Sequence, residues 1–291
     1  MAKLKSLNRL CRILEIDKDD LLHIVNNKSV HTFYKCKKEG FKCRRIDEPR
    51  GDLKIVQKKI HSRILKPEVQ KMPEIVMGYR GGGDSVINAK IHQGAKEMLK
   101  YDFENFFPSI SSDRIRYVFR YELGFTAYVA NLLTYLCTNN EGVLAQGMPT
   151  SSSLAILATK KMAIRLGEYA KENNINISIY VDDITISSRR RGELSRLKGG
   201  IESVIKSTKL PINNMKSGKI IKKGQPGFSV TGITITRDNK LSIGRRKKSK
   251  MRLINRVVNR GNKTKKMVMS RDGLINYEKR VKKLSSLLIE K

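Results

Sequence analysis

Apolar positions along the chain follow two spacings, which predict a mixture of helices and strands. Near-helical spacing runs through the first thirty residues and recurs in several later segments. These later segments are 52–65, 85–96, 111–123, 152–173 and 192–208. Short apolar or alternating runs at 97–103, 177–186 and 228–243 predict strands. From residue 97 onward the elements follow a β-α-β-β-α-β order, which indicates an α+β fold.

Three aspartates occupy the ends of the predicted strands. Asp182 and Asp183 lie between two apolar strands and are expected at the tip of a β-hairpin, while Asp102 ends the strand at 97–103. Aspartate is also a common turn residue, which is the simpler explanation of the pair. However, neighbouring strands would bring all three carboxylates to one edge of a core sheet, where unpaired negative charge is costly. Divalent cations remove that cost, so the pattern predicts a site for two Mg²⁺ ions.

Charge composition points to a polyanionic partner. The 291 residues carry a formal net charge of +33, far more than solubility requires, and nucleic acid is the usual partner of such a surplus. Residues 244–291 alone contain 17 Lys and Arg against 3 Asp and Glu. An anionic membrane surface is the competing partner, but we find no apolar run near 18 residues and no signal peptide, so no membrane partner is expected.

Four cysteines are scattered along the chain without a CxxC pair: Cys11, Cys36, Cys43 and Cys137. Reduced thiols in a cytosolic protein are the simpler expectation. A zinc site that includes Cys36 and Cys43 is the weaker alternative.

Three segments resemble the catalytic blocks of reverse transcriptases, in the same order and at similar spacing. Tyr180–Asp183 is similar to the YxDD box, Tyr101–Ile110 to the first catalytic block, and Gln146–Ser151 to the QGxxxS block. The resemblance extends over about residues 40–240 and implies a right-hand polymerase fold. The expected parts are N-terminal helices and fingers in 1–96 with part of 120–150, a ferredoxin-like palm with an antiparallel sheet in 97–240, and a short basic helical thumb in 241–291.

The resemblance implies roles for individual residues. Asp102 and Asp182 would be the principal ligands of two Mg²⁺ ions, for which Mn²⁺ could substitute, with Asp183 and the backbone carbonyl of Phe103 beside them. The remaining assignments concern the deoxynucleoside triphosphate: Phe107 as the steric gate under the sugar, Gln146 and Gly147 in the nucleotide pocket, Arg44 or Arg45 on the triphosphate, and Lys216 as proton donor to the pyrophosphate. For each basic residue, a solvated surface charge is the simpler explanation.

Two further segments resemble the retron branch of this family. Asn88–His92 is similar to the NAxxH segment and Val230–Gly232 to the VTG segment of bacterial retron reverse transcriptases, where both are associated with RNA binding. For Asn88 and His92 the alternatives are a helix cap and a histidine hydrogen-bonded in the core. The QGxxxS block departs from the family pattern, with Ser152 and Ile156 where proline and asparagine are usual.

Membership of the retron branch implies a particular product and set of partners. Such an enzyme takes its cognate structured non-coding RNA as template and primer, starts from a guanosine 2′-hydroxyl, and makes branched, RNA-linked multicopy single-stranded DNA. A bacterial cytoplasmic location, a retron effector protein as partner and a role in anti-phage defence are expected. The alternatives are a reverse transcriptase of the diversity-generating or abortive-infection type, and a non-catalytic RNA-binding scaffold.

The basic tail begins with Arg245, Arg246, Lys247 and Lys248 and continues as a helical pattern. It resembles a polymerase thumb, which would contact the RNA and its cDNA product through phosphates. A merely solvated basic helix is the alternative.

Overall fold

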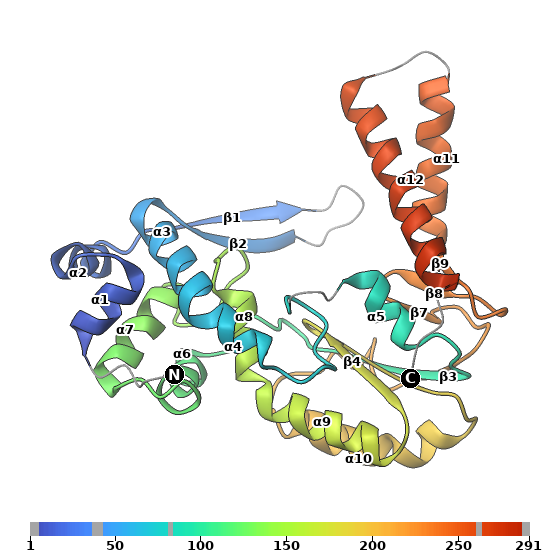
Figure 1. Cartoon of the computed structure of the whole chain (residues 1–291), viewed down its shortest axis with the longest axis horizontal. Helices are drawn as coiled ribbons and strands as arrows, with labels where there is room; N and C mark the ends of the chain where they lie inside the picture. Colours follow the sequence, from blue (N-terminus) through green and yellow to red (C-terminus); the bar gives the residue numbers. More distant parts are fainter. Residues whose placement is uncertain (1–5, 37–42, 81–83, 260–263, 287–291) are drawn as a thin grey trace.

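The computed structural model describes residues 6–36, 43–80, 84–259 and 264–286 (Figure 1). The described part of the chain begins and ends with pairs of helices. The helices are α1 (Leu7–Leu14), α2 (Lys18–Asn26), α3 (Gly51–Ile60), α4 (Lys66–Gln70), α5 (Ser85–Ile91), α6 (Ser112–Tyr117), α7 (Ala127–Cys137), α8 (Ser151–Ala158), α9 (Lys160–Glu172), α10 (Glu193–Lys206), α11 (Arg245–Asn259) and α12 (Lys265–Ser286). Two π-helical turns, His61–Leu65 and Val118–Glu122, extend α3 and α6.

A four-stranded antiparallel sheet forms the centre of the molecule. Its strands are β3 (Glu97–Asp102), β4 (Asn176–Tyr180), β5 (Asp183–Ser188) and β6 (Ile220–Lys222), in the order β4-β5-β3-β6. With α6–α9 between β3 and β4 and α10 between β5 and β6, this is the strand order of a ferredoxin-like sheet, as predicted. The assignment of the last strand to 228–243 is wrong, because β6 takes the place beside β3.

The segment 228–243 instead forms a separate three-stranded sheet, β7 (Ser229–Val230), β8 (Ile233–Ile235) and β9 (Leu241–Ile243). Its apolar side chains pack with Val86 and Ala89 of α5 and with Val281 of α12 in a second, smaller hydrophobic core. The main core lies under the central sheet and joins it to the N-terminal helices and to α7–α10.

Two hairpins extend from the upper part of the molecule in Figure 1, one running across the view and the other rising upward. One is the β-hairpin of β1 (Val30–Cys36) and β2 (Cys43–Pro49), and the other is the helical pair α11 and α12. At the outer end of the β-hairpin, Cys36 and Cys43 are cross-strand partners and form a disulfide. The expectation of reduced thiols is therefore wrong for these two, because strand pairing brings their sulfurs together. Cys11 and Cys137 are free and buried.

Local sequence explains where the helix preceding the central sheet begins. The Asp84 carboxylate accepts hydrogen bonds from the backbone N–H groups of Val86 and Ile87, at 2.7 and 2.9 Å, and so caps α5. This helix ends at Ile91, earlier than predicted, and the long helix predicted over 152–173 is divided at Thr159 into α8 and α9. Within the described ranges, no helix has the length and apolar character needed to cross a membrane.

Candidate active site

The three predicted carboxylates lie at one edge of the central sheet. Asp102 is the last residue of β3 and is the direct cross-strand partner of Asp183, the first residue of β5. Asp182 lies in the tight turn before it, and its carbonyl accepts a hydrogen bond from the Phe103 N–H at 3.4 Å. The expectation that strand pairing would bring Asp102 to the hairpin tip is confirmed.

The turn itself has an unusual backbone. Val181 adopts a φ of +62°, a left-handed conformation that a β-branched residue rarely takes. The segment ending at Gly78 lies against this turn, since the N–H groups of Met77 and Gly78 both donate to the Ile179 carbonyl. A side chain at residue 78 would come within 2.9 Å of the Val181 backbone nitrogen, so only glycine fits there without displacement.

Asp102 is held from the opposite side by the segment after α10. Its Oδ2 accepts a hydrogen bond from Lys216 Nζ at 2.7 Å and a longer one from Asn213 Nδ2 at 3.4 Å. Its backbone N–H donates to Ser217 Oγ at 3.0 Å, and its carbonyl accepts from the Asn213 N–H at 2.9 Å. Lys216, the predicted proton donor, thus lies beside the carboxylates. Asn213 and Ser217, which fix the aspartate, are not singled out by the sequence analysis.

The pKa values of two of the carboxylates crowded at this edge, Asp182 and Asp183, are raised. Desolvation, together with the negative charges of Asp182 and Asp102, raises the pKa of Asp183 to about 6, although its side chain reaches solvent. The pKa of Asp182 is also raised, first by desolvation and then by Asp102. The hydrogen bond to Asp102 raises the pKa of Lys216, which keeps this side chain protonated.

The carboxylates suit a hard divalent cation by their chemistry. Desolvation and neighbouring negative charge disfavour the ionised forms of Asp182 and Asp183, and a cation among the carboxylates would offset both effects. In the described part of the chain, however, the side chains of His, Cys, Asp and Glu form no ready-made cluster of three or more around a common metal position. Lys216 is the cation that contacts Asp102 instead.

The two arginines proposed for the triphosphate point to different surroundings, because successive residues of a strand alternate between its faces. Arg44 is exposed, and its charge acts on Asp182 by lowering the pKa of that carboxyl. Arg45 forms ion pairs with Asp47, at 3.0 Å, and with Glu141. Of the two, Arg44 is the one whose charge reaches the aspartates.

Gln146 and Gly147 lie against β2. The Gln146 carbonyl accepts a hydrogen bond from the Asp47 N–H at 2.8 Å. Gly147 has a φ of +109°, and a Cβ there would come within 2.8 Å of the Asp47 carbonyl oxygen, so the turn requires glycine. The segment predicted to line the nucleotide pocket is thereby joined to the strand that carries Arg44.

Aromatic residues follow Asp102 closely. Phe103 and Phe106 are buried and stacked, with ring centroids 5.4 Å apart, and the Phe106 ring lies 5.6 Å from that of Phe107. Phe107 is half-buried on the edge of this group. Phe106 therefore supports Phe107, the predicted gate.

The two segments predicted to bind RNA meet in the second core. Asn88 and His92 of the α5 segment are 1% and 0% exposed, and His92 hydrogen-bonds Ser187 at 2.7 Å and Ser178 at 2.8 Å. These serines lie on β5 and β4. His92 is therefore a histidine hydrogen-bonded in the core, which was the alternative to direct RNA contact. Val230 is buried.

The turn after Val230 contacts the start of α5. Thr231 and Gly232 occupy this turn, where Thr231 Oγ1 donates to the Ser85 carbonyl at 2.9 Å.

The first residues of α11 present a basic surface. Arg245 and Arg246 are exposed, Lys247 and Lys248 are half-buried, and Lys247 Nζ lies 4.2 Å from the centre of the Tyr277 ring. The Tyr277 hydroxyl lies within hydrogen-bond distance of Ser85 Oγ, at 3.2 Å, and Arg280 forms an ion pair with Asp84. The helical pair α11–α12 is therefore attached to α5.

Comparison with known proteins places this geometry in a family. Residues 36–235 match the family described as reverse transcriptase (RNA-dependent DNA polymerase). The chain is 30% identical to the retron Ec86 reverse transcriptase of Escherichia coli over 76% of its own length and 68% of the relative's. It is 30% identical to the Escherichia coli retron Ec83 enzyme (74% and 71%) and 32% identical to the Salmonella heidelberg retron Se72 enzyme (79% and 62%).

A solved structure shares the fold at much lower sequence similarity. The telomerase of Candida albicans, determined in complex with a fragment of telomeric RNA, superposes with a TM-score of 0.50 and 10% identity. The match covers 76% of this chain and 48% of the telomerase chain. The fold is accordingly that of the right-hand polymerases. The chain belongs to the reverse transcriptases, as an RNA-directed DNA polymerase of the retron type.

Proposed function

We propose that this protein adds deoxynucleotides by a two-metal mechanism centred on Asp102, Asp182 and Asp183. The observation that carries the proposal is the cross-strand pairing of Asp102 with Asp183 beside the Val181 turn, which crowds three carboxylates at one sheet edge. Asp102, Asp182, Asp183 and the Phe103 carbonyl would hold the ions. Bound Mg²⁺ would neutralise triphosphate charge and favour ionisation of the attacking hydroxyl, and Mn²⁺ could substitute.

The chain's own residues then position and protonate the substrate. Arg44 would contact the triphosphate, and Gln146 and Gly147 would line the pocket against β2. Lys216, kept protonated by Asp102, would donate a proton to the leaving pyrophosphate. Phe107 would exclude a ribose 2′-hydroxyl.

We further propose that the template and primer are the enzyme's own structured non-coding RNA. Synthesis would begin at a guanosine 2′-hydroxyl and yield branched, RNA-linked multicopy single-stranded DNA, in the bacterial cytoplasm and in a phage-defence system with an effector protein. Support comes from the contacts among α5, the Val230–Gly232 turn and α12, which form one packed unit. This unit holds the basic residues Arg245–Lys248 beside the central sheet. Within it, Asn88 and His92 would act by supporting that unit.

In this proposal the fingers comprise residues 1–96 with part of 120–150, the palm comprises 97–240, and the thumb comprises 241–291. RNA would bind mainly to the exposed basic residues, since buried side chains have no surface to offer.

The decisive experiment is the identity of the product. The protein is expressed with the DNA flanking its gene, and small nucleic acids are isolated and treated with a 2′–5′ debranching enzyme. A DNA joined to RNA that the debranching enzyme separates supports the proposal. An unbranched DNA product would indicate another type of bacterial reverse transcriptase, and RNA binding without DNA would indicate a scaffold.

A further inference from the structure

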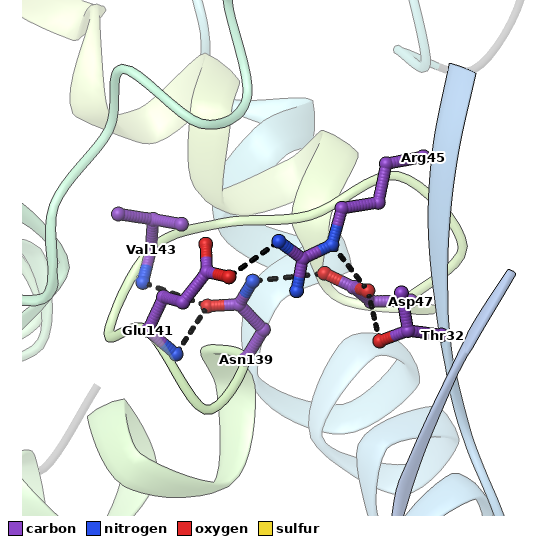
Figure 2. Close-up of polar contacts among 6 residues, drawn as sticks. All are labelled: Thr32, Arg45, Asp47, Asn139, Glu141 and Val143. Carbon is purple, nitrogen blue, oxygen red and sulfur yellow. Dashed lines mark hydrogen bonds and ion pairs between the residues drawn. The ribbon is translucent and has the colours of Figure 1, made fainter. Parts of the chain in front are cut away.

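Asp47 is a carboxylate buried away from the three aspartates, at the base of the β1–β2 hairpin. It is 1% exposed, and three side chains donate hydrogen bonds to it (Figure 2). Thr32 Oγ1 and Arg45 Nε bond to Oδ1 at 2.7 and 3.0 Å, and Asn139 Nδ2 bonds to Oδ2 at 2.8 Å. Burial alone would raise the pKa of Asp47, but the bonds from Asn139, Thr32 and Arg45 outweigh it and lower the pKa.

Asn139 extends this network into the loop that follows α7. Its Oδ1 accepts the backbone N–H groups of Glu141 and Val143, both at 3.1 Å. Its own N–H and carbonyl bond to Val143 and Gly142, which closes the loop upon itself. Glu141 also pairs with Arg45, so the loop is tied to β2 at two points (Figure 2).

The backbone of Asp47 makes a third connection. Its N–H donates to the Gln146 carbonyl at 2.8 Å, and its carbonyl lies so close to Gly147 that a Cβ there would come within 2.8 Å. One residue therefore contacts β1, the 139–143 loop and the Gln146–Gly147 turn. Arg44 lies three residues before it on the same strand.

We infer that Asp47 and Asn139 form a positioning pair that holds the β1–β2 hairpin and the Gln146–Gly147 turn in one arrangement, so that Arg44 and Gln146 meet the same incoming deoxynucleoside triphosphate. The inference rests on the proposed function. A bond between a buried carboxylate and a single amide is suited to this task, because neither partner can move without leaving a buried polar group unsatisfied. Both side chains are buried, so we expect them to act on nucleotide affinity through the position of Arg44 and Gln146 and not by contact with the substrate.

The hydrogen-bond pattern permits an exchange test. In Asp47→Asn alone, the orientation that keeps Oδ1 toward Arg45 Nε sets the new amide against the Asn139 amide, donor against donor, and the opposite orientation sets it against Arg45 Nε–H. Turning Asn139 over would direct its amide at the N–H groups of Glu141 and Val143. In the double variant Asp47→Asn/Asn139→Asp, the new amide donates to the new carboxylate. That carboxylate still accepts both loop N–H groups, and Oδ1 at residue 47 still accepts from Thr32 and Arg45. Every hydrogen bond is retained, with one reversed in direction, while the negative charge moves from residue 47 to residue 139.

The experiment measures single-nucleotide incorporation by the wild type, the two single variants and the double variant, each in complex with its RNA. Each single variant is expected to raise KM for the deoxynucleotide about tenfold or more, with a smaller change in kcat, as loss of a buried charge-assisted hydrogen bond predicts. The double variant should recover most of the loss. Glu48→Gln is the matched control, because Glu48 is the next acid on β2 and pairs with Lys54 and Arg50, outside the network.

The same proteins are titrated with a non-incorporable deoxynucleotide analogue and are unfolded by heat. Lower melting temperatures with unchanged KM and unchanged analogue affinity would show a structural role only and overturn the inference. Failure of the double variant to recover affinity would overturn it too. If the wild type makes no DNA, the proposed function fails while analogue binding still decides whether the pair acts.

Discussion

Lys216 Nζ lies 2.7 Å from Oδ2 of Asp102, at the sheet edge where Asp183 is the cross-strand partner of that aspartate. The only basic side chain hydrogen-bonded to Asp102 among the described residues therefore comes from the segment that follows α10. The Lys216 side chain is 61% exposed, so it is free to leave the carboxylate if substrate and metal bind there as proposed. Its contact with Asp102 keeps a proton beside the aspartates without burying the lysine.

Replacing both turn aspartates tests the two-metal mechanism. We expect Asp182→Asn/Asp183→Asn to reduce deoxynucleotide incorporation about a thousandfold or more, because several kcal/mol of transition-state stabilisation depend on the metal ligands. Binding of the cognate RNA, measured by gel shift, should survive. Substantial residual polymerisation by this variant would contradict the assignment.

Lys216 is tested by a pair of variants. Lys216→Ala and Lys216→Arg should both slow single-turnover incorporation, by about a hundredfold, because general acid catalysis is lost. Arginine retains the charge beside Asp102 but releases its proton far less readily. A normal rate for Lys216→Arg would mean that the charge matters and the proton does not. Since the ion pair is exposed, thermal stability should change little.

Phe107 is tested through sugar selectivity. Phe107→Ala removes the half-buried ring beside Phe106 and should allow incorporation of ribonucleotides. The measurement is the ratio of kcat/KM for a deoxynucleotide to that for the matching ribonucleotide. An unchanged ratio would remove Phe107 from the gate role.

Gly78 supports the catalytic turn from behind. A Cβ in Gly78→Ala would come within 2.9 Å of the Val181 nitrogen and 3.0 Å of its Cγ2, and would push the turn that carries Asp182. We expect kcat to fall about 10- to 100-fold, as displacements near 1 Å do in active sites. Gly167→Ala is the control, because the nearest atom to its Cβ is Ile75 Cδ1 at 3.9 Å. Equal activity of the two variants would contradict a supporting role for Gly78.

His92 predicts a pH dependence of folding. Burial lowers its pKa to about 3 in the folded protein, against an ordinary value near 6.5. Between these values the unfolded chain binds a proton that the folded chain does not, so stability falls as pH decreases through this window, by about 1.4 kcal/mol per pH unit. Above about pH 6.5 this contribution is fully present.

The measurement is urea unfolding between pH 7 and pH 5. His92→Gln should lose this share of the pH dependence while being less stable at pH 7, because glutamine cannot reproduce both serine bonds. Identical pH slopes for the two proteins would show that the histidine is protonated in the folded state.

The positions of the three aspartates were predictable from the sequence, because the order of the strands determines which residues lie at the same sheet edge. Asp102 and Asp183 could be expected together for that reason. The strand β6 was missed because three residues contain too little alternation to be recognised. The environments of Arg44 and Arg45 could not be distinguished from the sequence. Arg45 pairs with Asp47 on its own strand, but its second partner, Glu141, lies in a loop distant in sequence and depends on tertiary packing.

The same limitation applied to the buried polar residues. His92 finds its two serines only when α5 packs on the sheet, so its internal role could be weighed but not decided from the sequence. The disulfide required knowledge that Cys36 and Cys43 are cross-strand partners.

The second hydrophobic core has a consequence for evolution and engineering. Because α12 packs on α5 and on β7–β9, the basic helical pair is anchored in the same hydrophobic core as both segments that resemble the retron branch. Segments that are separate in sequence but packed together in this core would therefore determine RNA preference jointly. In a chimera that exchanges only the C-terminal helices, α12 would pack poorly against α5 and β7–β9. Transplanting 84–96 and 228–286 together should transfer recognition between relatives while leaving the polymerisation chemistry in place.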